Sequence, residues 1–127
     1  MNTELLNITP VLPSADIERD VAWYEKHVGF TPFFSDRMYA ALQRDDLWLH
    51  LQWHADTGSD PLLGGSVIRI FVRNIRPMFE ELVGRGTVGR EAFRPHTPWQ
   101  TSEFGFHDLN RNAIFIVEDL PVSASHH

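Results

Sequence analysis

The most informative stretch of the chain is residues 94–104, which read RPHTPWQTSEF. Pro95 and Pro98 restrict the backbone on both sides of this loop, so Trp99 is held in a stiff connection. Two strand-like runs follow, at residues 102–107 and 113–118. A stiffened loop that carries one large aromatic ring into a sheet favours a ligand site. The alternative is that Trp99 plugs a hydrophobic interface between two parts of the fold.

Length and composition suit one compact domain. The chain has 127 residues, of which 43% are hydrophobic, enough for one buried core and too few for two independent ones. The lack of cysteine excludes disulfides, thiolate nucleophiles and thiolate metal sites. No basic segment followed by an apolar run opens the chain, so we expect a cytoplasmic protein that does not contact membranes. The final residues Ser125, His126 and His127 resemble the remnant of a purification tag, and we exclude them from the site.

The charge balance argues against a nucleic-acid partner. The formal net charge is −6, and Lys26 is the single lysine, whereas binding to a phosphate backbone requires clustered Lys and Arg. A neutral or cationic small molecule fits this balance better. The simpler alternative is that moderate acidity only aids solubility.

The first half of the chain predicts a strand, a helix and three further strands. Residues 5–12 are predicted as a strand that ends at Pro13. Ser14 or Asp16 can cap the helix that follows, and Gly29 can end it. Its apolar face is formed at helical spacing by Ile17, Val21, Tyr24 and Val28. The next predicted strands are residues 30–35, 38–43 and 47–53, and a tight turn at residues 44–46 joins the last two.

The second half repeats this order after a Gly- and Asp-rich linker at residues 55–65. Residues 67–72 are predicted as a strand. An amphipathic helix then starts near Ile75, tolerates Pro77 in its first turn and ends near Gly84 and Gly86. The remaining predicted strands are residues 88–93, 102–107 and 113–118. We therefore expect an α+β chain, a single domain over residues 1–127 built of two βαβββ modules at about 5–54 and 66–119.

Short segments in a matching order add a family resemblance. Residues 10–16 (PVLPSAD), 22–24 (AWY) and 29–30 (GF), followed by 44–46 (RDD), 72–73 (VR) and 98–99 (PW), are similar to those of bleomycin-resistance proteins. The chain thus resembles the vicinal oxygen chelate superfamily, which also includes glyoxalase I, extradiol dioxygenases and fosfomycin-resistance proteins. The resemblance implies the glyoxalase/bleomycin-resistance fold and a homodimer that exchanges amino-terminal strands and has two ligand clefts at its interface. Pro10 matches the proline where the exchanged strand leaves its subunit, although an ordinary edge-strand proline is the alternative.

The resemblance also locates the positions where metal enzymes of the superfamily hold their ion. These positions are Thr9, His50, Val67 and Phe115, and of these only His50 binds transition metals well. We therefore expect no metal, no cofactor and no catalytic residue. A site that combines His50 with Gln52, His54 or His107 is a remote alternative, and no nucleophile or phosphate-loop motif is present.

Alternation in residues 47–53 places Trp48, His50 and Gln52 on one face of a strand, opposite the leucines. If the leucines face the helices, this face lines the cavity. His50 would then bond a ligand, or would be satisfied by its neighbours or by a dimer contact.

Further site residues are implied by the resemblance. Bleomycin combines a planar bithiazole with a cationic tail, so its binders offer aromatic surfaces beside acids. Trp99 matches the tryptophan that covers the bithiazole and Tyr39 an aromatic of the opposing wall, while Phe34 and Asp36 match a pocket aromatic and the acid that faces the cationic part. His50, Gln52 and Arg69 complete the predicted ligand-binding set.

Two departures from the family pattern concern charge. Phe33 replaces an expected acid, and Arg69 occupies a wall position that faces the cavity. These changes would suit another aromatic ligand, or one that carries an anion. Because successive strand residues alternate between faces, Phe33 and Phe34 are not expected to share one face.

The sequence predicts a non-catalytic, dimeric protein that sequesters bleomycin-type glycopeptides. The first alternative is a glyoxalase- or dioxygenase-like enzyme of the same fold, and the second is a binder of another aromatic small molecule.

Overall fold

The computed structural model describes residues 2–121, which form two mixed sheets and two helices. The first sheet has the strand order β1-β4-β3-β2, and the second has the order β5-β7-β6. In each sheet, the first strand of the module pairs parallel with the last. The elements are β1 (Val11–Ser14), α1 (Ile17–Val28), β2 (Thr31–Ser35), β3 (Tyr39–Arg44), β4 (Leu47–Trp53), β5 (Val67–Phe71), α2 (Ile75–Gly84), the 3₁₀ helix η1 (Arg90–Ala92), β6 (Thr101–His107) and β7 (Ala113–Asp119).

Helix α1 follows its predicted signals. The side chain of Asp16 caps it by accepting from the Arg19 backbone N–H at 3.1 Å, and Gly29 ends it in the left-handed region at φ 76°. The predicted apolar stripe is buried against the first sheet: Ile17, Val21, Tyr24 and Val28.

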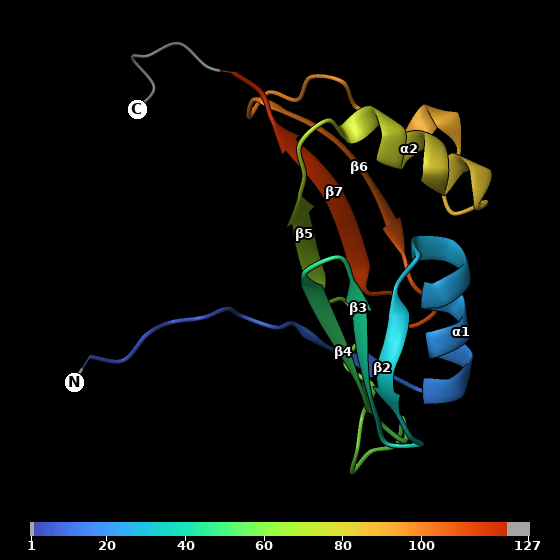
Figure 1. The fold of residues 1–127 in the computed structure, drawn as a ribbon. Coiled ribbons are helices and arrows are strands. Elements are labelled where there is room, and N and C mark those ends of the chain that lie inside the picture. Colours follow the sequence, from blue (N-terminus) through green and yellow to red (C-terminus); the bar gives the residue numbers. More distant parts are fainter. Residues whose placement is uncertain (1, 122–127) are drawn as a thin grey trace.

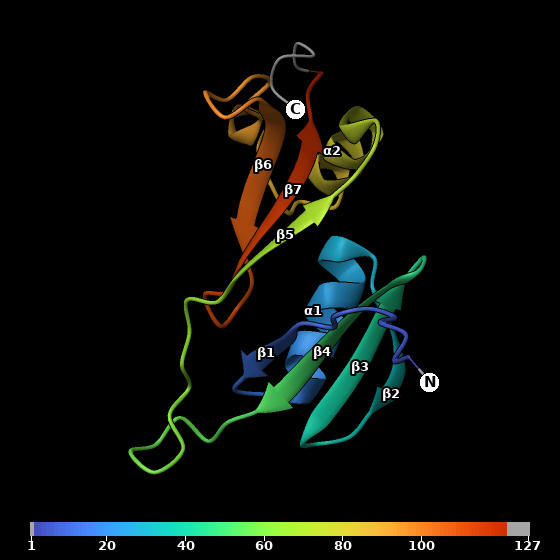
Figure 2. The same cartoon turned by 90° about the vertical axis from the view of Figure 1, so that its left-hand side faces the viewer.

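Both helices lie on the same side of the two sheets, so the opposite face of each sheet is uncovered (Figures 1 and 2). Alternate strand residues therefore face the helices, and among them Leu49, Leu51, Ile114 and Ile116 are at most 2% exposed. The buried cluster includes residues of both modules, from Leu12 to Ile116.

The predicted strand over residues 5–12 is wrong in extent. β1 starts at Val11 and continues through Pro13, which lies opposite Gln52. Proline is tolerated there because β1 is an edge strand, so no strand on its outer side needs the missing N–H. Residues 2–10 instead leave the body of the chain on the uncovered side (Figure 1). We call this segment the arm, and its apolar side chains Leu5, Leu6 and Ile8 are 92%, 80% and 96% exposed.

The predicted strand over residues 88–93 is also wrong. η1 occupies its centre, because Phe93 turns toward α2 and packs on Phe79 with ring centroids 4.9 Å apart. Just after this segment, Arg94 forms an isolated antiparallel bridge with Glu103 of β6. The second module thus keeps the βαβββ-like path with a helical turn at its third element, and the predicted α+β fold class is confirmed.

Buried polar groups join α1 to the turn between β6 and β7. Asp20 accepts from the Ser14 hydroxyl at 2.5 Å and from the Asn110 amide at 2.7 Å. The Tyr24 hydroxyl donates to Asp108 at 2.6 Å, and burial together with that carboxylate raises the pKa of Tyr24. The bonds from Asn110 to Asp20 and from Tyr24 to Asp108 connect the modules across at least 84 residues of sequence. Within residues 2–121, no helix is long and apolar enough to cross a membrane.

Candidate functional site

The uncovered face of the first sheet carries the side chains that the alternation of β4 predicts. Tyr39 lies opposite Gln52, and His50 and Trp48 lie opposite small or polar residues of β3. Cross-strand partners share a face, so these four residues belong to one surface. Tyr39 and Trp48 each stack edge-on against His50, with centroids 5.3 and 6.3 Å apart.

His50 has a partner on this surface. The Tyr39 hydroxyl lies 2.7 Å from His50 Nδ1. A neighbouring side chain thus satisfies one ring nitrogen, which was one of the alternatives for His50. The other ring nitrogen, Nε2, is left for a ligand.

The prediction that Phe33 and Phe34 lie on opposite faces of the sheet is wrong. The register between β2 and β3 shifts between Pro32 and Phe34, so Phe33 is the extra residue of a β-bulge. Phe34 lies opposite Ala41, the neighbour of His50, while the ring of Phe33 packs edge-on against Trp48 at 5.4 Å. Both rings therefore border the uncovered face, and they are 76% and 49% exposed.

The uncovered face of the second sheet is centred on Phe115. Arg69 and Gly105 lie opposite it on the two neighbouring strands. A Cβ atom at Gly105 would be 2.6 Å from the Phe115 ring, so the ring rests directly on the glycine backbone. The guanidinium of Arg69 lies 5.8 Å from the Phe115 ring centroid and 5.7 Å from that of Phe71.

A buried carboxylate that the sequence did not single out connects two predicted site residues. Glu103 is 2% exposed, and its Oε1 accepts from Trp99 Nε1 at 2.6 Å and from the Thr101 hydroxyl at 2.8 Å. Its Oε2 accepts from Arg69 at 3.2 Å. Burial alone would raise the pKa of Glu103, but the bonds from Thr101 and Trp99 and the charge of Arg69 outweigh it and hold the pKa below its usual range.

Trp99 is fixed at its nitrogen and open on its ring. Its side chain is 53% exposed, and the Arg94 guanidinium lies 5.1 Å from the ring centroid. The loop is closed by Thr97, whose hydroxyl lies 2.7 Å from the Thr101 hydroxyl and whose N–H donates to the Thr101 carbonyl at 2.8 Å. The indole is therefore a preformed aromatic surface, although half-exposed rather than buried as an interface plug.

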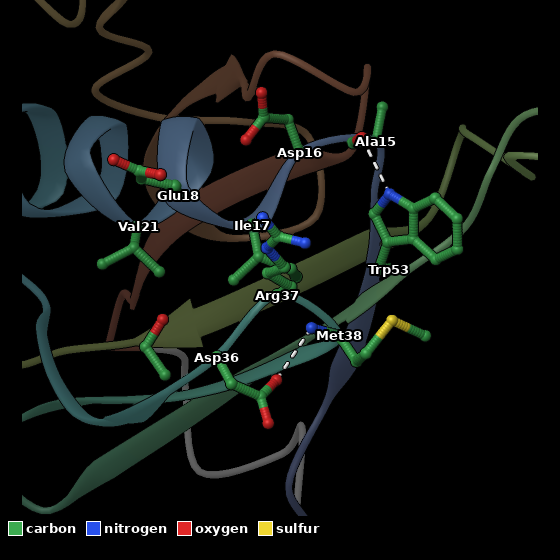
Figure 3. A pocket seen from close by; sticks show the side chains of 10 residues that line it. Ala15, Asp16, Ile17, Glu18, Val21, Asp36, Arg37, Met38 and Trp53 are labelled. Carbon is green, nitrogen blue, oxygen red and sulfur yellow. Dashed lines mark hydrogen bonds between the residues drawn. The ribbon is translucent and has the colours of Figure 1, made fainter.

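Asp36 lies apart from this set. Its Oδ1 accepts from the backbone N–H groups of Met38 and Tyr39 at 2.7 and 2.9 Å, which fixes the turn between β2 and β3. It lines a groove of about 750 Å³ between that turn and the start of α1, where Asp16 and Glu18 also lie (Figure 3). Arg69 does not line this groove, so the structure separates Asp36 from Arg69.

A second groove of about 380 Å³ contains side chains from both uncovered faces. Trp48 enters it from β4, and Arg69 and Phe71 from β5. The base of the arm, from Asn7 to Pro10, forms part of its wall.

Comparisons with known proteins agree on the architecture. No family model and no curated protein matches the sequence. A crystal structure of a bleomycin-binding protein complexed with bleomycin superposes with a TM-score of 0.73 at 22% identity, covering 91% of this chain and 99% of that one. A bleomycin resistance determinant encoded on the transposon Tn5 gives 0.71 at 25% identity, covering 91% and 98%. A glyoxalase/bleomycin resistance protein/dioxygenase from Nocardioides gives 0.72 at 20%, covering 94% and 87%.

The chain has the glyoxalase/bleomycin-resistance fold.

Within the glyoxalase/bleomycin-resistance fold, the four positions implied for a metal do not form a ligand set here. Thr9 precedes β1, Val67 and Phe115 carry no donor atom, and His50 is bonded to Tyr39. His54, another alternative, lies 2.7 Å from Asp60 in the linker. Among residues 2–121, no group of three or more His, Cys, Asp or Glu side chains is close enough to hold an ion.

Proposed function

We propose that the chain is a non-catalytic protein that captures an aromatic small molecule reversibly, with bleomycin-type glycopeptides as the first candidates. The observation that carries this proposal is Trp99, a half-exposed ring whose nitrogen is fixed by a buried carboxylate. A ring that is already held in place loses little conformational entropy when a ligand binds, so little of the stacking free energy is offset. Two of the solved neighbours are described as binding bleomycin or conferring resistance to it, which makes the drug the natural probe.

The same residues give little support to catalysis. The carboxylate of Glu103 is 2% exposed and accepts three hydrogen bonds, and the imidazole of His50 already bonds Tyr39 through Nδ1. A general base must reach the proton that it removes, and a buried, hydrogen-bonded carboxylate does not. To the remaining nitrogen of His50, Nε2, we assign a hydrogen bond to the ligand. We therefore assign capture rather than turnover to this site.

The binding unit that we propose is a homodimer of single-domain chains, each built of the two modules. The arm exposes Leu5, Leu6 and Ile8, and the uncovered faces add Phe33 and Val67, which are 76% and 61% exposed. Exposed apolar surface of this extent is typical of an interface. A second copy would cover it and would bring the uncovered faces of two chains around a shared cleft, with the arms exchanged.

The test is a titration of the purified protein with copper-loaded and with metal-free bleomycin, followed by tryptophan fluorescence and calorimetry. We expect saturable binding and a drug that is recovered unchanged. Elemental analysis of the same sample separates the alternatives, because stoichiometric transition metal together with product formation would establish an enzyme. Absence of any heat or fluorescence change with both drug forms would rule out bleomycin-type glycopeptides, and the same result with 2-naphthoate and its amide would disprove capture.

A further inference from the structure

Charge is unevenly distributed between the uncovered faces and the rest of the chain. The strand residues that face outward on the first sheet include no Asp, Glu, Lys or Arg: Val11, Pro13, Thr31, Phe33, Phe34, Tyr39, Ala41, Gln43, Trp48, His50 and Gln52. On the second sheet the outward residues include three charges, Arg69, Glu103 and Asp119. Asp119 ends β7 four residues beyond Phe115, about 13 Å away along the strand.

Of the central pair, only the cation reaches the groove. The Glu103 side chain is 2% exposed, whereas that of Arg69 is 36% exposed. Arg69 lines the 380 Å³ groove together with Trp48 and Phe71, and Glu103 is not among the residues that line it. A chain with a net charge of −6 thus presents a positive group at the centre of this surface.

The donors of Arg69 are only partly used. Within residues 2–121, its one hydrogen bond runs from an Nη1 hydrogen to Glu103. The guanidinium has five N–H donors in a planar fork, so four remain for a ligand. The rings of Phe71 and Phe115 lie 5.7 and 5.8 Å from its central carbon and, with Glu103, restrict its position.

We propose that the ligand of this site is an aromatic molecule that carries a planar anion, a carboxylate in its simplest form, bound by Arg69. This inference rests on the proposed function, because it names the ligand class of the groove beside Trp99. Trp99 itself does not line that groove, but Glu103 bonds both Trp99 and Arg69. The fork matches a carboxylate edge to edge, and charge-assisted bonds of this kind are the stronger ones. The ring of the ligand packs against Trp48 and Phe71, which share the groove.

One carboxylate lies at the rim of the groove. Asp46 belongs to the turn between β3 and β4 and is exposed, so water and salt screen its effect on a ligand at Arg69. Glu103 lowers the positive potential of Arg69 without removing it. We therefore expect a preference of about tenfold for the anion over a neutral analogue, less than an isolated buried arginine would give.

The test uses three probes of one shape: 2-naphthoate, 2-naphthamide and 2-naphthylmethylammonium. Each is titrated calorimetrically into the full-length protein and then used to displace copper-bleomycin. We expect the carboxylate to bind about tenfold more tightly than the amide, the ammonium to bind most weakly, and the preference to shrink at high salt.

Arg69→Gln removes the charge and should equalise the carboxylate and the amide. Arg90→Gln is the matched control, because it removes one positive charge from the exposed pair with Glu80 and should keep the preference. The comparison of probes in the unmodified protein does not depend on whether the Arg69 variant folds.

The outcomes separate the two proposals. If bleomycin binds but the three probes are equivalent, or none of them displaces it, the anion assignment is overturned and capture stands. If neither drug nor probe binds, the proposed function falls as well. The same holds if the protein is a dimer whose second copy covers the face and leaves no room for drug or probe.

Discussion

Replacement of Glu103 by glutamine tests the contact on which the proposed site depends. The side chain keeps its shape, but one of its two oxygens becomes an NH₂ group. If the amide oxygen accepts from Trp99 and Thr101, the NH₂ faces the Arg69 donor, and if it flips, the NH₂ faces the other two. Either orientation sets two donors against each other.

The cost follows from burial. At 2% exposure, water does not replace the lost acceptor, so we expect the free energy of unfolding to fall by about 1–3 kcal/mol. For a chain of this size that lowers Tm by roughly 4–12 °C. Glu80→Gln is the matched control, because Glu80 pairs with Arg90 at the surface and its loss should change stability by less than about 0.5 kcal/mol.

The assay joins stability to the position of the indole. Thermal unfolding gives Tm, and fluorescence anisotropy, measured with Trp23, Trp48 and Trp53 replaced by phenylalanine, reports whether Trp99 has become mobile. Because the folded pKa of Glu103 is lowered, its contribution is complete above the ordinary carboxyl range and is lost as pH falls through the folded pKa. The difference in stability between the two proteins should therefore narrow on acidification. A variant with unchanged Tm and anisotropy would refute the claim that Glu103 holds Trp99.

Three further predictions concern the ring, the arm and the packing of the second sheet. Trp99→Ala should weaken copper-bleomycin binding by more than about tenfold in calorimetry, whereas Trp23→Phe on α1 should not, and equal affinities would place Trp99 outside the cleft. Removal of residues 2–9 should convert the proposed dimer to a monomer in sedimentation, and a dimer that persists without these residues would exclude arm exchange. Gly105→Ala should destabilise by about 1–3 kcal/mol in denaturant unfolding because its Cβ meets an aromatic ring at 2.6 Å, and Gly58→Ala, which meets nothing within 4 Å, should stay within about 0.5 kcal/mol.

Local rules predicted those elements whose causes lie within a few residues. The cap at Asp16, the glycine stop at Gly29 and the period between them defined α1, and strict alternation defined β4 to the residue. The outward face of β4 followed from the same alternation. Each of these features depends on neighbours in sequence, so a single sequence is sufficient.

The errors occur where distant partners decide. The apolar pattern of the arm is typical of a strand, but within residues 2–121 no strand pairs with residues 2–9. The bulge at Phe33 adds one residue to β2, and alternation cannot anticipate an insertion in the register. Phe93 resembles a strand residue until α2 supplies Phe79 as its packing partner.

Glu103 was missed for a related reason. A carboxylate in a strand is expected to face water, and burial is stable only when its partners are already in place. One partner, Arg69, lies 34 residues earlier in the chain, and Trp99 reaches it only because the loop folds back onto β6. The alternation of β6, which puts Glu103 on the face opposite Phe104 and Phe106, was the available signal.

The charge of the ligand shows how composition and position can disagree. A net charge of −6 favours a neutral or cationic ligand when it is treated as a property of the whole surface. Binding depends instead on the charges within about 8–10 Å of the ligand, since salt screens exposed charges beyond that distance. The charged group that is accessible from the groove at the centre of the second sheet is Arg69. Asp36, the acid matched to a cationic tail, lies in another groove, and two backbone N–H groups already bond its Oδ1. A bleomycin-type drug would therefore be held through its neutral rings, and the charge preference of the site should follow Arg69 rather than the net charge of the chain.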